Sequence, residues 1–138
     1  MLKGIPNIIS PELLKILHEM GHGDEIVIGD GNFPAASNAQ RLVRADGHNV
    51  PELLDAILKL FPLDTYVDSP VMLMSTTKDD PTPTIWAEYQ AIIDKHQPSK
   101  MSEIERFAFY ERTRDAYAVV ATSETALYAN IILKKGVI

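Results

Sequence analysis

His22 and Asp30 are the two residues of this chain whose types and positions best suit acid/base chemistry. His22 stands between two glycines, whose small size would let an imidazole project into a pocket. Asp30 directly follows a short apolar segment, and ligands of α/β sheets bind outside the carboxyl ends of strands. Because imidazole has a pKa of about 6.5, the two residues predict an acid/base site. A backbone-bonded turn histidine and a turn-capping aspartate are the competing interpretations.

A metal site also has to be considered at His18-Glu19-Met20-Gly21-His22, which matches the H-E-x-x-H string of zinc proteases. That string requires both imidazoles on one continuous helix, but Gly21 is expected to end the helix before His22. We therefore expect no metal site, and a zinc hydrolase built on His18 and His22 stays as an alternative. Since no phosphate-binding glycine pattern or complete calcium loop occurs, we also expect no cofactor.

Further polar candidates lie in the last third of the chain. Tyr128 and Asn130 precede an apolar segment, and strand alternation directs both to one side. A phenol and a carboxamide could exchange hydrogen bonds with sugar hydroxyls while the ring covers an apolar sugar face, or both could be core-edge residues. Arg106 begins a polar and aromatic segment that ends at Arg112. The alternative to a functional role for this segment is a structural helix with an aromatic inner face and a charged outer face.

The composition limits the class of protein. With 138 residues, 46% of them hydrophobic, the chain has the size of one domain, and we expect a single domain over residues 1–138. The net charge of −6 argues against nucleic-acid and anionic-membrane partners and fits a small or neutral ligand. The chain lacks long apolar runs, a signal-peptide pattern and cysteine, so we expect a cytoplasmic protein.

Apolar spacing and capping residues predict the helices. The expected N-caps are Ser10, Asn49 and Thr84, and the expected helical segments are 11–20, 50–61, 85–96 and 109–116. Strand-like apolar runs occupy 25–29, 71–74, 117–121 and 130–133, with a weaker one at 41–45 and polar loops at 30–37 and 78–83. This alternation predicts an α/β fold in three layers, with a central, largely parallel sheet flanked by helices. The strand order cannot be read from the pattern.

Seven segments together resemble the fucose mutarotase and ribose pyranase family, and specifically its L-fucose branch, over nearly the whole length. They are residues 1–5, 10–15, 21–26, 32–34, 44–47, 106–112 and 128–137. The resemblance implies a homo-oligomeric ring, often a decamer, with an active site at the contact between subunits and no cofactor. It implies interconversion of the α and β anomers of L-fucose by acid/base-assisted ring opening. A ribose-type pyranase and a sugar-binding module without turnover are the alternatives.

The resemblance also implies roles for individual residues. It gives His22 the catalytic role and assigns monosaccharide binding to Asp30, Arg106, Tyr128 and Asn130. Two positions depart from the family pattern, residue 31, which is Gly where Ala is expected, and residue 32, which is Asn where some relatives carry His. These two differences could alter the preferred sugar.

Overall fold

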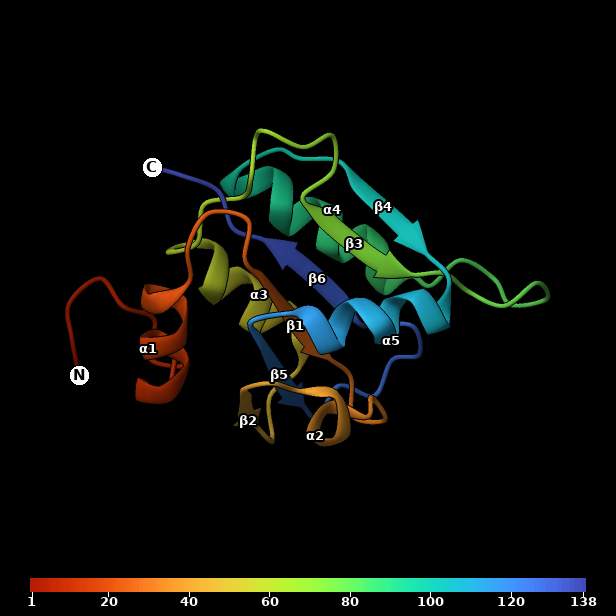
Figure 1. Cartoon of the computed structure of the whole chain (residues 1–138), viewed down its shortest axis with the longest axis horizontal. Helices are drawn as coiled ribbons and strands as arrows, with labels where there is room; N and C mark the ends of the chain where they lie inside the picture. Colours follow the sequence, from red (N-terminus) through yellow and green to blue (C-terminus); the bar gives the residue numbers. More distant parts are fainter.

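Six strands form one mixed sheet in the computed structural model, which describes residues 1–138 (Figure 1). The strands are β1 (Glu25–Gly29), β2 (Leu42–Ala45), β3 (Val71–Met74), β4 (Met101–Ile104), β5 (Ala118–Thr122) and β6 (Ile131–Lys134). Their order across the sheet is β2-β5-β1-β6-β3-β4. β6 is antiparallel to both of its neighbours, whereas the other adjacent pairs are parallel. The expectation of a largely parallel sheet is confirmed.

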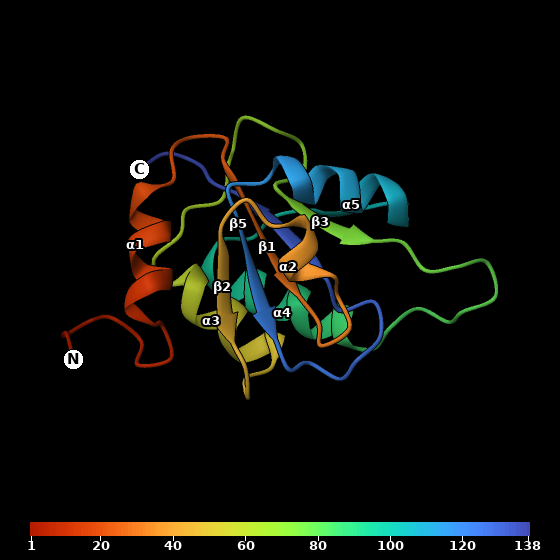
Figure 2. The same ribbon diagram turned by 60° about the horizontal axis from the view of Figure 1, so that its bottom comes forward.

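Helices cover both faces of this sheet (Figures 1 and 2). They are α1 (Pro11–Glu19), α2 (Ala35–Asn38), α3 (Val50–Leu58), α4 (Ile85–His96) and α5 (Arg106–Asp115). One cluster of 27 buried residues joins α1, α3 and α4 to one face, and a second cluster of nine joins α2 and α5 to the other. The three-layer arrangement is therefore confirmed. None of these helices combines the length and the apolar character needed to cross a membrane.

β1 shows why the central strands are continuously apolar. Ile26 and Ile28 belong to the larger core cluster and Val27 to the smaller one, because successive side chains point to opposite faces. All three are 0% exposed, and each contributes about 1.5–3 kcal/mol through burial. Packing on both faces fixes β1 in the middle of the molecule, so the residues at its two ends lie at opposite edges of the sheet.

The predicted caps are confirmed at two of three helices. The Ser10 hydroxyl oxygen accepts a hydrogen bond from the Leu13 N–H at 3.1 Å, and the Asn49 side chain accepts one from the Glu52 N–H at 3.0 Å. Each such cap is worth about 1 kcal/mol. Thr84 does precede α4, but the capping role predicted for its side chain is wrong. Its backbone is already helical, at φ −66° and ψ −27°, and the side chain makes no cap hydrogen bond.

Several elements differ from their expected bounds. α5 begins at Arg106, three residues earlier than predicted, because the Glu105 carboxylate accepts hydrogen bonds from two N–H groups of the first turn. The edge strand β4 was not predicted, and the short helix α2 begins inside the expected loop at 30–37 and ends one residue after it. α1 ends at Glu19, so His18 and His22 do not share a helix.

Candidate functional site

The carboxyl end of β1 and the start of β6 meet at one edge of the sheet. Because the two strands are antiparallel and Ile28 pairs with Ile131, Asp30 and Asn130 lie next to each other although they are 100 residues apart. Met74, at the carboxyl end of β3, reaches the same edge because β3 also pairs with β6. A pocket of about 200 Å³ opens here, lined by Asp30, Asn32, Phe33, Met74, Tyr110, Leu127, Tyr128 and Asn130.

Asp30 and Asn130 form the polar floor of this pocket. They are 8% and 5% exposed, and the Asp30 N–H donates to Asn130 Oδ1 at 2.7 Å. The Asn32 N–H donates to Asp30 Oδ1 at 3.0 Å. Burial raises the pKa of the Asp30 carboxyl above its usual value, and the Asn32 amide partly opposes that effect. The arrangement fixes a carboxylate acceptor and a carboxamide at the base of a small cavity.

Aromatic side chains form one wall of the pocket. The Phe33 ring meets the rings of Phe109 and Tyr110 edge to face, at centroid distances of 5.8 and 5.7 Å. A Cβ atom added at Gly29 would lie 2.8 Å from the Phe33 ring. Glycine is therefore needed at this end of β1 for the Phe33 ring to pack against the backbone. Such a wall can cover the apolar C–H face of a small polar ligand while the floor binds its hydroxyl groups.

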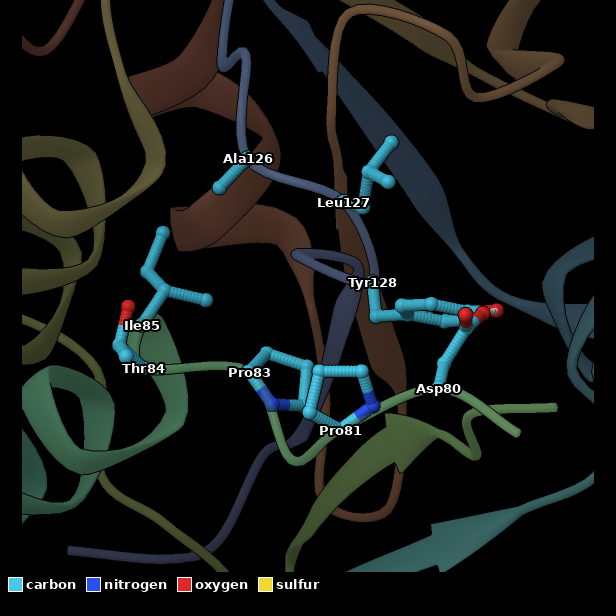
Figure 3. Close-up of a pocket in the computed structure, with 8 residues that line it drawn as sticks. All are labelled: Asp80, Pro81, Pro83, Thr84, Ile85, Ala126, Leu127 and Tyr128. Carbon is cyan, nitrogen blue, oxygen red and sulfur yellow. Dashed lines mark hydrogen bonds between the residues drawn. The ribbon is translucent and has the colours of Figure 1, made fainter. Parts of the chain in front are cut away.

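Tyr128 lies at the rim of the pocket in an uncommon backbone conformation. Its φ of 56° is in the left-handed region, which costs a non-glycine residue about 1–3 kcal/mol. Two contacts hold it there. Its carbonyl oxygen accepts a hydrogen bond from the Trp86 indole N–H at 2.8 Å, and its hydroxyl accepts one from the Thr77 N–H. The same hydroxyl donates to Asp80, which Figure 3 shows beside it.

Arg106 lies outside the set of pocket-lining residues. It is exposed in the first turn of α5, with its guanidinium 4.6 Å from the centre of the Phe107 ring. Tyr110, which lines the pocket, follows one turn later on the same helix. The structure thus brings Asp30, Tyr128 and Asn130 together and leaves Arg106 on the neighbouring surface.

His22 lies at the other end of β1. Its Nε2 atom is 3.0 Å from Oδ1 of Asp64, and its ring is 5.2 Å from that of Tyr66. Asp64 is only 4% exposed, and hydrogen bonds from the Tyr66 N–H and then from His22 hold the pKa of its carboxyl below the usual value. Asp64 therefore stays ionised at neutral pH and orients the imidazole, whose side chain is 44% exposed.

Sequence reasoning missed Asp64, and no local pattern marks it. The partnership with His22 spans 42 residues. It forms because the end of β6 and the residue after it run between the segment that carries His22 and the segment that carries Asp64. Lys135 exchanges backbone hydrogen bonds with Gly23 and Asp24, and the Asp64 N–H donates to the Lys134 carbonyl oxygen. Only the fold reveals such a pairing.

Within one chain His22 and Asp30 do not face each other. The four residue steps of β1 alone span about 13 Å, which exceeds the width of a monosaccharide ring. Of the two glycines beside His22, only Gly23 has a positive φ, at 87°, and it serves the turn. No group of three or more His, Asp or Glu side chains is placed to hold a metal ion.

Together these features define an α/β protein with a small, polar and aromatic ligand pocket outside the carboxyl ends of its strands. The model of the RbsD / FucU transport protein family matches residues 3–138, and the chain belongs to this family.

Named relatives match over almost the whole length. Human fucose mutarotase is 53% identical over 99% of this chain and 94% of its own. The L-fucose mutarotase of Actinobacillus pleuropneumoniae serotype 5b is 51% identical over 99% of this chain and 97% of its own. The crystal structure of the Streptococcus pneumoniae fucose mutarotase in complex with L-fucose superposes with a TM-score of 0.97, at 56% identity and 99% coverage of both chains.

Proposed function

We propose that this chain interconverts the α and β anomers of L-fucose. The observation that carries the proposal is its likeness to the Streptococcus pneumoniae enzyme, which was solved with L-fucose and is 56% identical at a TM-score of 0.97. The pocket supports it, because a buried carboxylate and carboxamide beside an aromatic wall suit a compact polyol with one apolar face.

Anomer exchange needs only proton transfer. The anomeric hydroxyl loses its proton while the ring oxygen gains one, the C1–O5 bond opens, C1 rotates, and closure on the other face reverses the steps. We assign the transfer to His22, since an imidazole can pass a proton in either direction near neutral pH. Asp64 occupies Nε2, so Nδ1 is the nitrogen left to face the sugar. Acid/base assistance of this kind is worth about 10²–10⁴ in rate.

The pocket residues would hold the sugar during these steps. The Asp30 carboxylate accepts hydrogen bonds from sugar hydroxyls. Asn130 and Tyr128, which lie just before β6, add a carboxamide and a phenol. Phe33 packs against the C–H face of the ring. Arg106, exposed beside the pocket, contacts the outer hydroxyls.

A second copy of the chain would complete the site. His22 and the pocket lie at opposite edges of the sheet, so we propose that the His22 of one copy enters the pocket of a neighbour. Exposed rings and aliphatic groups flank both places: Tyr66 beside His22 is 76% exposed, whereas Phe107 and Leu127 beside the pocket are 63% and 68% exposed. Apolar groups left exposed in this way favour an interface.

Such a contact joins the His22 surface of one copy to the pocket surface of the next. Because the two surfaces differ, the copies repeat head to tail. Contacts of this type close into rings when the rotation between copies allows it. We propose a homo-oligomeric ring, for which a decamer is the size implied by the family resemblance.

Saturation-transfer NMR on L-fucose tests the proposal. Saturating the α-anomer H1 signal should reduce the β-anomer signal far more when the purified protein is present than in buffer. His22→Ala should abolish this gain, while His18→Ala, on the exposed face of α1, should retain it. If the wild-type protein leaves the exchange rate at its value in buffer, the proposed activity is wrong.

A further inference from the structure

The loop between β3 and α4, residues 75–84, connects to the sugar pocket through Tyr128. Figure 3 shows the Asp80 carboxylate reaching the Tyr128 hydroxyl from this loop. The phenol donates its proton to Asp80 Oδ2, and the Thr77 hydroxyl donates to the same oxygen at 2.8 Å. The Thr77 N–H lies 3.3 Å from the phenolic oxygen and donates to it.

These contacts determine which hydrogen bond Tyr128 can still make. A phenol has one proton to donate and two lone pairs that accept. The phenol directs its proton to Asp80, and one lone pair takes the Thr77 N–H. The Thr77 hydroxyl lies 3.2 Å from the phenolic oxygen but directs its own proton to Asp80, so one acceptor site is left for a ligand. Hydrogen bonds from Tyr128 and then from Thr77 lower the pKa of the Asp80 carboxyl, so it remains an ionised acceptor at neutral pH.

We propose that Asp80 is a positioning residue that orients Tyr128, so that its phenolic oxygen accepts a hydrogen bond from a sugar hydroxyl. The inference rests on the proposed function and deepens it. Asp80 does not line the sugar pocket. It lies in the adjoining hollow of about 220 Å³, which shares only Tyr128 and Leu127 with the pocket (Figure 3). Asp80 thus acts through Tyr128 and does not touch the ligand.

The surroundings of Asp80 separate an effect on Tyr128 from an effect on folding. Asp80 is exposed on a surface loop, so removing its side chain opens no cavity in the core. The backbone of Tyr128 is held separately by Trp86, whose indole N–H donates to the Tyr128 carbonyl oxygen at 2.8 Å. Loss of Asp80 should therefore free the phenol to turn without unfolding the segment that carries it.

A double-mutant cycle on L-fucose binding tests the inference. Calorimetric Kd values would be measured for wild type, Asp80→Ala, Tyr128→Phe and the double variant, with Asp79→Ala as a matched control. Asp79 is a neighbouring exposed carboxylate that makes no side-chain hydrogen bond. Asp80→Ala should weaken binding about 2- to 12-fold, the range of one hydrogen bond between neutral groups such as a sugar hydroxyl and a phenol. Asp79→Ala should bind like wild type.

The decisive comparison is made in the variant that already lacks the phenolic hydroxyl. Adding Asp80→Ala to Tyr128→Phe should cost nothing further, because the hydroxyl through which Asp80 acts is gone. The inference is overturned if Asp80→Ala binds as tightly as wild type, or if it weakens binding equally with and without the hydroxyl. Because calorimetry measures binding whether or not the anomers are exchanged, a protein that binds L-fucose but fails to speed anomer exchange would refute the proposed activity alone.

Discussion

His22 and Asp30 are held at opposite ends of β1, with the fully buried residues Ile26, Val27 and Ile28 between them. This separation is rigid, because β1 is paired on both sides and packed on both faces. A catalytic base at one end and a sugar site at the other cannot meet within the chain. The proposed activity therefore depends on contact between copies, and variants at either edge should have distinguishable effects.

The first prediction concerns the support of His22 by Asp64. Asp64→Asn keeps an oxygen that can accept the Tyr66 N–H but removes the charge beside the imidazole. The maximal exchange rate should fall by at least about tenfold, a part of the roughly 10²–10⁴ that acid/base assistance provides, while KM changes little because Asp64 lies at the His22 edge. Exchange spectra at several L-fucose concentrations measure both quantities. Asp68→Asn, which removes an exposed carboxylate, is the control.

The second prediction concerns Asn130. Asn130→Ala leaves the buried Asp30 N–H without the acceptor that it now has at 2.7 Å. The free energy of unfolding should drop by about 1–3 kcal/mol, the cost of an unsatisfied buried donor, and KM for L-fucose should rise. Urea titration and exchange kinetics measure the two effects. Asn7→Ala, on the exposed N-terminal segment, should change neither, and an unaltered KM in Asn130→Ala would count against a contact with sugar.

The third prediction is a pH dependence of stability that arises from Asp30. Burial raises the pKa of this carboxyl in the folded state above 3.8, so the folded protein holds the proton more tightly than the unfolded chain. The stabilisation that this bound proton gives to the folded state is complete below pH 3.8, and it is lost as the pH rises through the raised pKa of Asp30. Asp30→Asn carries no titrating group there, so its Tm should gain on that of wild type between about pH 4 and pH 7. A Tm difference that shrinks over this interval would contradict the assignment.

The fourth prediction concerns Gly136, which packs against the segment that carries Asp64. An added Cβ would lie 2.5 Å from the Leu63 carbonyl oxygen and 2.8 Å from the Asp64 Cα. Since both are backbone atoms, Gly136→Ala must displace this segment, at a cost of about 1–3 kcal/mol in unfolding free energy and with a reduced exchange rate. In Gly21→Ala the nearest atom would be 3.7 Å away, so stability should hold. Chemical denaturation of the two variants provides the comparison.

Local signals in the sequence were enough to predict much of the fold. Ser10 and Asn49 cap their helices as expected, because the capping hydrogen bond involves residues three positions apart. β1 and β3 have the predicted bounds, because strands buried on both faces are apolar without interruption. β4 was missed because an edge strand lacks that signature, and its residues are mostly half-buried.

The candidate site was less accessible to sequence reasoning. Asp30 and Asn130 could be named as polar residues beside strands, but their adjacency depends on β6 running antiparallel to β1. Asp64 and Asp80 contact residues that are 42 and 48 positions away in the sequence. Contacts over such separations arise from the path of the chain between elements, which periodicity does not describe.

Complementation between two inactive variants tests the central claim most directly. His22→Ala and Asp30→Asn proteins would be mixed, unfolded and refolded together, and L-fucose anomer exchange would then be measured by saturation-transfer NMR. If His22 acts on a sugar held by a neighbouring copy, about a quarter of the sites in an equal mixture regain both residues, and activity returns although neither parent has any. A refolded mixture as inactive as its parents would contradict the account.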